Sequence, residues 1–274
     1  MPSVVGFVGA GQMGEPMVIR MLAAGHEVHV YARRDKVLDR LRARGAYSAP
    51  SVAELGPCDV VVCTLFLDLQ LEDVALGNGG LIAAMKVGST LVSHTTGSVE
   101  TIRRLADVAA AGGVNVVDAP ISGTADEILA GTLTVLLGGD LEPINRAVPI
   151  LESYAQQIVR TGELGSALKV KLINNLLFAA NLQLVADAVR LGRELGIEVD
   201  GLLDAVQHCS GASSASKRVV EVGGLANFVD RARPFLSKDI AVCLDAVRDL
   251  GAQEGVLGDV AVDGPLELRA DPSR

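Results

Sequence analysis

Hydrophobic positions in the first half of the chain alternate between short runs of β-branched residues and stretches with helical spacing. The short runs predict strands at residues 4–8, 27–31, 60–64, 89–93, 114–117 and 133–137. Apolar residues recur every three or four positions at residues 14–24, 36–44, 81–85 and 101–111, which predicts helices between the strands. Strands that alternate with helices form a parallel sheet, so we expect a doubly wound α/β domain.

The pattern changes after residue 162, where no further strand is expected. Residues 166–192 form one long segment rich in Leu, Ala, Ile and Val, and shorter helical stretches follow to about residue 251. We therefore predict a first domain at residues 1–162 and an all-α C-terminal domain at residues 163–274, joined by a long helix. Because a helix that is apolar on nearly every face must be buried on nearly every face, we expect a homodimer or homotetramer that packs through the C-terminal helices. Residues 271–274 are expected to be disordered.

The composition argues against two classes of partner, nucleic acids and membranes. The net charge is −9, the pI is about 5.0, aromatic residues make up 3% of the chain, and there is no Trp. These values argue against nucleic acid as a partner. The charge-free run at residues 172–186 is short and contains four amide side chains, so we expect no membrane partner either.

The cysteine, histidine and basic residues suggest a cytoplasmic location and argue against a metal site. The four cysteines match neither a disulfide framework nor a zinc pattern, and no basic residue of a signal peptide precedes Arg20. We expect a cytoplasmic protein. The four histidines are scattered without the spacing of metal ligands, so we predict no metal site.

A glycine-rich turn follows the first predicted strand and begins the first predicted helix. It consists of Gly9, Ala10, Gly11, Gln12, Met13 and Gly14. In this position the first glycine allows a tight turn, the second lets the backbone approach a pyrophosphate, and the third lets the helix and strand pack closely. The free N–H groups and dipole of the helix would then bind the phosphates. The motif predicts a Rossmann-type dinucleotide site formed by all six residues.

Two arginines, Arg33 and Arg34, lie at the end of the second predicted strand, where the adenosine ribose would be. An acidic residue there would accept hydrogen bonds from the ribose of NAD, whereas guanidinium groups suit the 2′-phosphate of NADP. We predict NADP as the cofactor, with NAD as the alternative. The other interpretation is a solvated surface pair, partly neutralised by Asp35.

Four segments resemble one enzyme family, in the family's order and across nearly the whole chain. They are the glycine turn, residues 118–123 with 131–133 (DAPISG and GTL), residues 165–175 (GSALKVKLINN), and residues 238–240 (KDI). Together they resemble the β-hydroxyacid dehydrogenases, which include 3-hydroxyisobutyrate dehydrogenases and semialdehyde reductases. The resemblance implies a Rossmann domain followed by a C-terminal domain like that of 6-phosphogluconate dehydrogenase. It also implies NADP-linked hydride transfer between a small β-hydroxy acid and its semialdehyde or keto acid.

The resemblance also implies roles for individual residues. The family's lysine stands three positions before the first Asn of a pair, which selects Lys171 rather than Lys169 as the general acid/base. Asn175, one helical turn later, would orient the substrate hydroxyl. Ser122, which also has a catalytic role, and the N–H groups of Gly123 and Thr124 would hold the substrate carboxylate. Asn174 and Lys238 are further implied substrate contacts. The implied cofactor contacts are Phe66, Leu67, Thr96 and again Lys238.

Some positions depart from the family pattern and leave other functions open. Thr124 replaces a loop glycine, and residues 66–67 and 93–96 differ from the usual cofactor contacts. The substrate is therefore not fixed by the resemblance. Two alternatives remain: an imine reductase of the same fold, and a catalytically silent scaffold that binds NADP.

Overall fold

The computed structural model describes residues 3–268, apart from the side chains of residues 234 and 235. The chain divides into two compact units, Met1–Lys171 and Leu172–Arg274, and the division falls inside helix α8 (Ser166–Glu194). The domain boundary after residue 162 stays a prediction, and residue 162 is the last residue of strand β9 (Ala155–Gly162). Residues 271–274, for which we expect disorder, lie outside the described residues.

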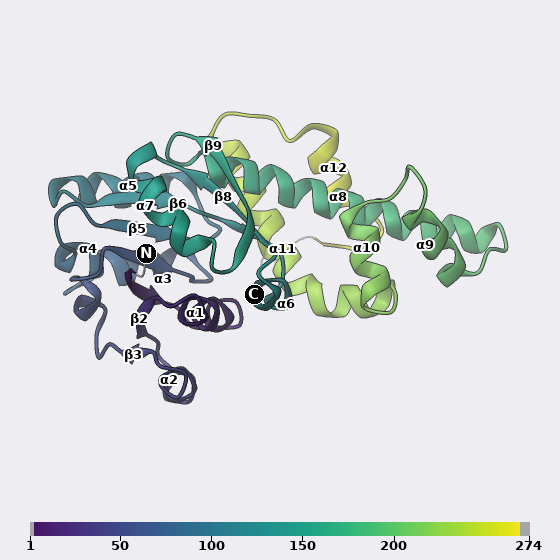
Figure 1. The fold of residues 1–274 in the computed structure, drawn as a ribbon. Helices are drawn as coiled ribbons and strands as arrows, with labels where there is room; N and C mark the ends of the chain where they lie inside the picture. The colour runs from purple at the N-terminus through teal and green to yellow at the C-terminus, as the bar shows by residue number, and fades with distance from the viewer. Residues whose placement is uncertain (1–2, 269–274) are drawn as a thin grey trace. The chain divides into compact units, whose positions relative to one another are not determined.

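The first unit is built on a nine-stranded sheet (Figure 1). Besides β9, its strands are β1 (Val4–Val8), β2 (Glu27–Tyr31), β3 (Tyr47–Ser48), β4 (Val60–Cys63), β5 (Thr90–Ser93), β6 (Asn115–Asp118), β7 (Ile121–Ser122) and β8 (Leu133–Gly138). The order is β3-β2-β1-β4-β5-β6-β8-β7, with β9 paired to β8. The pairings from β3 to β6 are parallel, β6 and β7 pair antiparallel with β8, and β9 pairs parallel with β8. The antiparallel pairings were not predicted from the sequence.

Helices cover both faces of this sheet. They are α1 (Gly14–Ala23), α2 (Asp35–Arg42), the 3₁₀ helix η1 (Val52–Leu55), α3 (Asp68–Leu76), α4 (Leu81–Ala84), α5 (Val99–Ala111), α6 (Ala125–Ala130) and α7 (Leu141–Leu151). One apolar core joins the strands to α1, α2, α6 and α7, and a second joins them to α3, α4 and α5. Strand β4 is buried along its whole length, as expected for a parallel strand covered on both faces. The sheet is therefore doubly wound, as predicted.

The strand order reverses between β1 and β4. β1 pairs with β2 on one side and with β4 on the other, and the chain leaves all three at the same edge because they are parallel. In open α/β sheets ligands bind at such a reversal, beyond the carboxyl ends of the strands. The fold therefore marks the segments after Val8, Tyr31 and Cys63 as the place to look for a site.

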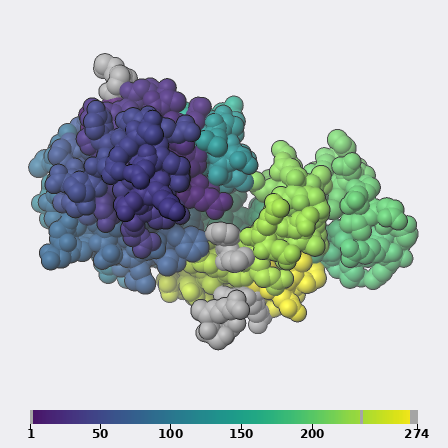
Figure 2. Space-filling model, turned by 90° about the horizontal axis from the view of Figure 1, so that it is seen from below, coloured from purple at the N-terminus to yellow at the C-terminus, as the bar shows by residue number. Residues whose placement is uncertain are grey.

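The described residues of the second unit form helices and the loops between them, with no strand. After α8 come α9 (Val199–Gln207), α10 (Ser214–Glu221), α11 (Leu225–Asp249) and α12 (Gly255–Asp263). Helices α9 and α11 both contact α10, and Figure 2 draws this part of the chain in green to yellow-green. Buried Gln183 of α8 donates to the carbonyl of Ala261 and accepts from the N–H of Leu266. The Rossmann-like sheet followed by a long helix and an all-helical domain confirms the predicted fold class.

Helix α8 is, within the described residues, the one helix whose length and hydropathy would let it cross a membrane. Its most apolar 18-residue window has a mean hydropathy of 1.4, and half of that window is buried inside the protein. The core helix of a globular domain meets the same criterion. The buried Gln183 side chain forms its hydrogen bonds within such a core. That the protein has no membrane partner stays a prediction.

Candidate active site

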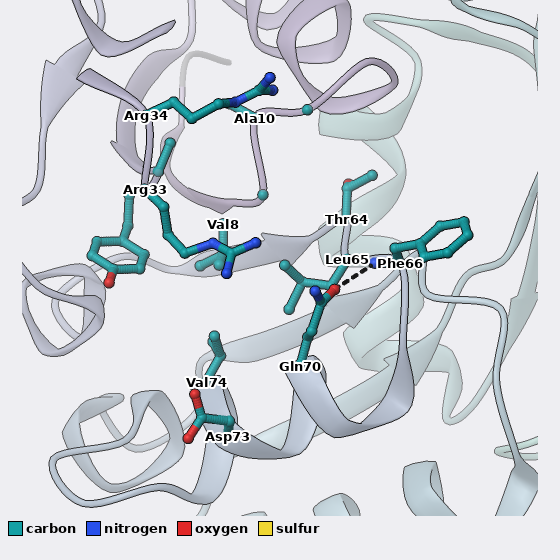
Figure 3. Close-up of a pocket in the computed structure, with 14 residues that line it drawn as sticks. Val8, Ala10, Arg33, Arg34, Thr64, Leu65, Phe66, Gln70, Asp73 and Val74 are labelled. Atoms are coloured by element: carbon teal, nitrogen blue, oxygen red, sulfur yellow. Dashed lines mark hydrogen bonds between the residues drawn. The ribbon is translucent and has the colours of Figure 1, made fainter. Parts of the chain in front are cut away.

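A cavity of about 550 Å³ opens at the strand-order reversal of the first unit (Figure 3). Its walls come from the segments that follow β1, β2 and β4, together with α3. The lining residues are Val8, Gly9, Ala10, Gly11, Tyr31, Ala32, Arg33, Arg34, Thr64, Leu65, Phe66, Gln70, Asp73 and Val74. Six predicted cofactor residues are among them: Gly9, Ala10, Gly11, Arg33, Arg34 and Phe66. Gln12, Met13, Gly14, Leu67 and Thr96 lie outside this lining.

The three glycines of the turn have three different surroundings. Gly9 has φ +94°, and a Cβ there would lie 2.2 Å from the carbonyl oxygen of Thr64. A Cβ on Gly14 would lie 2.2 Å from the carbonyl oxygen of Gly9, so this glycine lets α1 approach the turn. A Cβ on Gly11 would meet nothing closer than 4.0 Å. Since no protein atom requires glycine at position 11, the open space beside it fits the close approach of a dinucleotide pyrophosphate.

Helix α1 begins directly after this turn. Its N-cap residue, Met13, provides no side-chain hydrogen bond to the first turn. The N–H groups at the start of the helix and its dipole therefore suit an external anion. Glu15 in the first turn is held by two 2.7 Å hydrogen bonds from Arg40, whose guanidinium lowers the pKa of that carboxyl group.

The two arginines after β2 remain available to a ligand. Both side chains are exposed, and among the described residues neither guanidinium forms an ion pair. Figure 3 shows the Arg33 side chain extending into the cavity. Asp73 of α3 contributes a carboxylate to the same cavity. The arrangement brings the predicted arginines to the predicted glycine turn.

The loops after β4 and β5 are tied together through Asp68. The N–H of Phe66 donates to Oε1 of Gln70 at 3.1 Å (Figure 3), and Leu67 is the N-cap residue of α3. Asp68, the next residue, accepts from the N–H of Ser98 at 2.7 Å. A Cβ on Gly97 would lie 1.6 Å from Asp68 Oδ1, so a side chain there would displace the Asp68 carboxylate. This contact fixes the loop that carries half-buried Thr96.

A buried histidine lies under the segment that follows β6. His94 is 3% exposed, and its ring nitrogens hydrogen-bond the carbonyl of Ala119 at 2.5 Å and the hydroxyl of Tyr154 at 2.8 Å. Burial lowers the pKa of His94 to about 4, so the ring is neutral at physiological pH. It supports the loop from within the core.

Asp118 anchors the start of α8. This carboxylate is fully buried at the end of β6 and accepts hydrogen bonds from the N–H groups of Gly165 (2.8 Å) and Leu168 (2.9 Å). Burial raises the pKa of Asp118, and the hydrogen bonds oppose that rise. A Cβ on Gly138 would lie 2.3 Å from Oδ1, so this glycine makes room for the carboxylate. Lys171 is half-buried one turn after Leu168.

The predicted substrate loop leads from β7 into α6. Ser122, Gly123 and Thr124 are half-buried, and Gly123 has φ +144°. Thr124 is the N-cap residue of α6 and forms a capping box with Glu127, in which its N–H donates to Glu127 Oε2 at 2.7 Å. The N–H that the sequence offers to a substrate carboxylate is thus engaged by the protein itself in this structure.

The asparagine pair continues α8 in the second unit. Asn174 is exposed, whereas Asn175 is 9% exposed and its amide donates to Asp239 Oδ2 at 3.1 Å. Lys238 lies 3.7 Å from the other oxygen of Asp239. Within the second unit, Asp239 brings together the predicted residues Asn175 and Lys238.

Sequence reasoning assigned no role to Asp118, Asp68, Glu127 or Asp239. Asp118 and Asp239 lie inside segments that carry the resemblance, but their partners are remote in sequence or come from the backbone. The Thr-x-x-Glu spacing of a capping box at residues 124–127 was a readable signal for Glu127. Among residues 3–268, no three His, Cys, Asp or Glu side chains gather to hold a metal ion.

Comparison with known proteins identifies the family. Residues 4–162 match the model of the NAD-binding domain of 6-phosphogluconate dehydrogenase, and residues 165–261 match the NAD-binding domain of NADP-dependent 3-hydroxyisobutyrate dehydrogenase. The 3-hydroxyisobutyrate dehydrogenase of Pseudomonas aeruginosa is 34% identical over 212 residues, covering 77% of this chain and 71% of that protein. The NAD-dependent L-serine dehydrogenase of the same organism is 32% identical over 212 residues, with the same coverage of each chain.

A solved structure agrees with these sequence relatives. The Mycobacterium tuberculosis 3-hydroxyisobutyrate dehydrogenase, determined with L-serine, superposes with a TM-score of 0.85 at 27% identity and covers 96% of this chain and 92% of that one. The two matched domain models span most of the chain in the order that the fold displays. The chain therefore belongs to the 3-hydroxyisobutyrate dehydrogenase group of the NAD(P)-dependent β-hydroxyacid dehydrogenase family.

Proposed function

We propose that this protein interconverts a small β-hydroxy acid and its semialdehyde or keto acid, using NADP(H), with Lys171 as the general acid/base. The observation that carries the proposal is the lysine near the start of α8, on the turn that follows the one held by Asp118. Two relatives are named for 3-hydroxyisobutyrate and L-serine, which are both small β-hydroxy acids. They support the substrate class for this chain.

In the proposed mechanism each residue transfers a proton, binds the substrate's negative charge or orients the substrate. NADP supplies the hydride acceptor, and NADPH the donor in reverse. During reduction the Lys171 ammonium donates a proton to the carbonyl oxygen as that oxygen gains charge, and during oxidation the amine takes the hydroxyl proton. Asn175 orients the hydroxyl group. Ser122, Gly123 and Thr124 are the proposed contacts of the substrate carboxylate, and Asn174 and Lys238 are further proposed substrate contacts.

The contacts of Asp239 in the second unit support the role proposed for Asn175. Asp239 accepts a hydrogen bond from the Asn175 amide and so fixes the orientation of that side chain. The same carboxylate lies 3.7 Å from Lys238 Nζ. An oriented amide presents one defined polar atom to a ligand, which is what the positioning of a hydroxyl group requires.

Replacing Lys171 tests the mechanism. We expect Lys171→Met to lower kcat/KM by about 10² to 10⁴, the usual contribution of general acid–base catalysis, and to leave NADPH binding unchanged. Lys169→Met is the matched control, because Lys169 lies two residues earlier on the same helix and faces another direction. NADPH absorbance with glyoxylate, succinic, methylmalonate and tartronate semialdehydes, and a cyclic imine, measures the rates.

Three results of this experiment would contradict the proposal. Wild-type turnover in Lys171→Met removes this lysine from the mechanism. Reduction of the cyclic imine in preference to the semialdehydes indicates an imine reductase. NADPH binding without turnover of any compound indicates a catalytically silent scaffold.

The cavity beside the glycine turn supports the choice of NADP as the cofactor. Arg33 and Arg34 line it without an ion pair among the described residues, so their guanidinium groups suit a 2′-phosphate. The matched description of the second domain also names an NADP-dependent enzyme, although one relative is named as NAD-dependent.

Removing both guanidinium groups tests this choice. We expect Arg33→Ala with Arg34→Ala to lower the kcat/KM ratio of NADPH to NADH by about tenfold to a hundredfold, the value of a lost charge-assisted hydrogen bond. Lys36→Ala removes a nearby exposed charge as the control. A wild-type preference for NADH at equal concentration would overturn the NADP assignment.

We further propose that two copies of the chain pack through α8, as a dimer or within a tetramer. Four large apolar residues repeat at helical spacing along this helix and are about half exposed: Ile173 (58%), Leu177 (51%), Leu184 (57%) and Leu191 (49%). A contiguous exposed apolar stripe is typical of an interface. The cytoplasm is the proposed compartment, and the absence of disulfides among the four cysteines supports it.

Sedimentation tests the assembly. We expect the wild type to sediment as a dimer or tetramer at micromolar concentration, and Leu184→Lys to shift it toward the monomer because a buried ammonium would lack a partner. Val87→Lys, at another exposed apolar position, is the control and should not change the assembly. A wild-type monomer would contradict the proposal.

A further inference from the structure

The loop at residues 122–124 carries a carboxylate of its own. The N–H of Thr124 donates to Glu127 Oε2 at 2.7 Å, and the hydroxyl of Thr124 donates to the same oxygen at 2.9 Å. The hydroxyl oxygen accepts from the N–H of Glu127 at 3.3 Å, which completes the capping box of α6. Thr124 and Glu127 thus satisfy each other's hydrogen-bonding groups across the first turn of the helix.

The same carboxylate lies close to the backbone of Gly123. A Cβ built on Gly123 would be 3.1 Å from Glu127 Oε2 and 2.7 Å from a methyl carbon of Leu133. Together with the φ of +144°, these contacts require glycine at this position. Glu127 therefore lies against the backbone of the loop itself.

A substrate carboxylate at this loop would compete with Glu127. Both anions would require the Thr124 N–H, and one N–H donates its hydrogen bond mainly to one acceptor. Gly123, Thr124 and Glu127 are all half-buried, where like charges repel more strongly than in bulk water. The chain's own carboxylate has the advantage because it is already held by two hydrogen bonds.

We propose that Glu127 is a specificity-determining residue that weakens the binding of a substrate carboxylate at this loop. As a result the enzyme discriminates poorly between a β-hydroxy acid and its neutral ester, and it accepts both. This inference rests on the proposed function, because it takes residues 122–124 as the substrate loop. It assigns the Thr124 N–H to the protein rather than to the substrate.

The test compares an acid and an ester of the same carbon skeleton. The probes are 3-hydroxyisobutyrate and its methyl ester, oxidised with NADP⁺ by the full-length chain. Glu127→Gln removes the charge but keeps an oxygen that accepts from Thr124. Asp126→Asn is the matched control, because it removes one charge from the neighbouring exposed residue of α6.

We expect Glu127→Gln to raise the ratio of kcat/KM for the acid to that for the ester by about tenfold, the effect of removing one like-charge contact, mainly through a lower KM for the acid. Asp126→Asn should leave the ratio within about twofold, since exposed charges are screened. Glu127→Ala also removes the charge and must shift the ratio in the same direction.

An unchanged ratio in both Glu127 variants, or an equal rise in Asp126→Asn, overturns the proposal. A wild type that strongly prefers the acid to the ester also overturns it. Failure of the proposed function gives a different result, namely no turnover of either probe or wild-type turnover in Lys171→Met. The two proposals can therefore fail separately.

Discussion

The hydrogen bonds between the Asp118 carboxylate and the start of α8 are the contact on which the catalytic proposal depends. A carboxylate at a helix N-terminus meets N–H groups that have no partner within the helix and the positive end of the helix dipole. Asp118 is buried, so it loses hydration and is stabilised chiefly by these N–H groups. It also begins the segment that leads through β7 to the predicted substrate loop. One side chain thus connects the loop to the helix turn that precedes Lys171.

The proposed cofactor site depends on which glycines of the turn the protein itself requires. Gly9 and Gly14 are needed by the protein, since a side chain at either would collide with backbone oxygen atoms. Gly11 has open space beside it, and that space belongs to the cavity lined by Arg33 and Arg34. The contrast separates a glycine that serves the fold from one that serves a ligand. Under the proposed function, the absence of Cβ at Gly11 and the two arginines without ion pairs among the described residues would both favour the binding of cofactor phosphates.

Local pattern was sufficient for the parts of the fold with strong periodicity. Strands β1 and β2 were predicted with their observed bounds, because each is a short run rich in β-branched and aromatic residues. Strand β9 was missed, since most of its residues are exposed and it has no apolar run. Helix α7 was missed because Pro143 and Pro149 interrupt its pattern. The two residues of β7 are too few to give a signal, and their pairing with β8 depends on the tertiary fold.

Some parts of the candidate site could also be predicted from local sequence pattern, and others could not. The glycine turn and the arginines could be read from sequence because they occupy fixed positions after strands. The roles of Asp118 and Asp239 could not, because their partners are backbone groups 47 and 50 residues away for the first and an amide 64 residues away for the second. Sequence distance hides such contacts, and only the folded chain displays them.

The most direct measurement of the central claim is the turnover of Asp118→Asn, with NADPH affinity and thermal unfolding measured on the same preparation. An amide accepts through one oxygen only and places its NH₂ group against an N–H donor, so the start of α8 loses one of its two contacts. We expect Asp118→Asn to lose about 2 kcal/mol of stability and at least about tenfold in kcat, with NADPH affinity unchanged. A folded Asp118→Asn protein with wild-type kcat would contradict it.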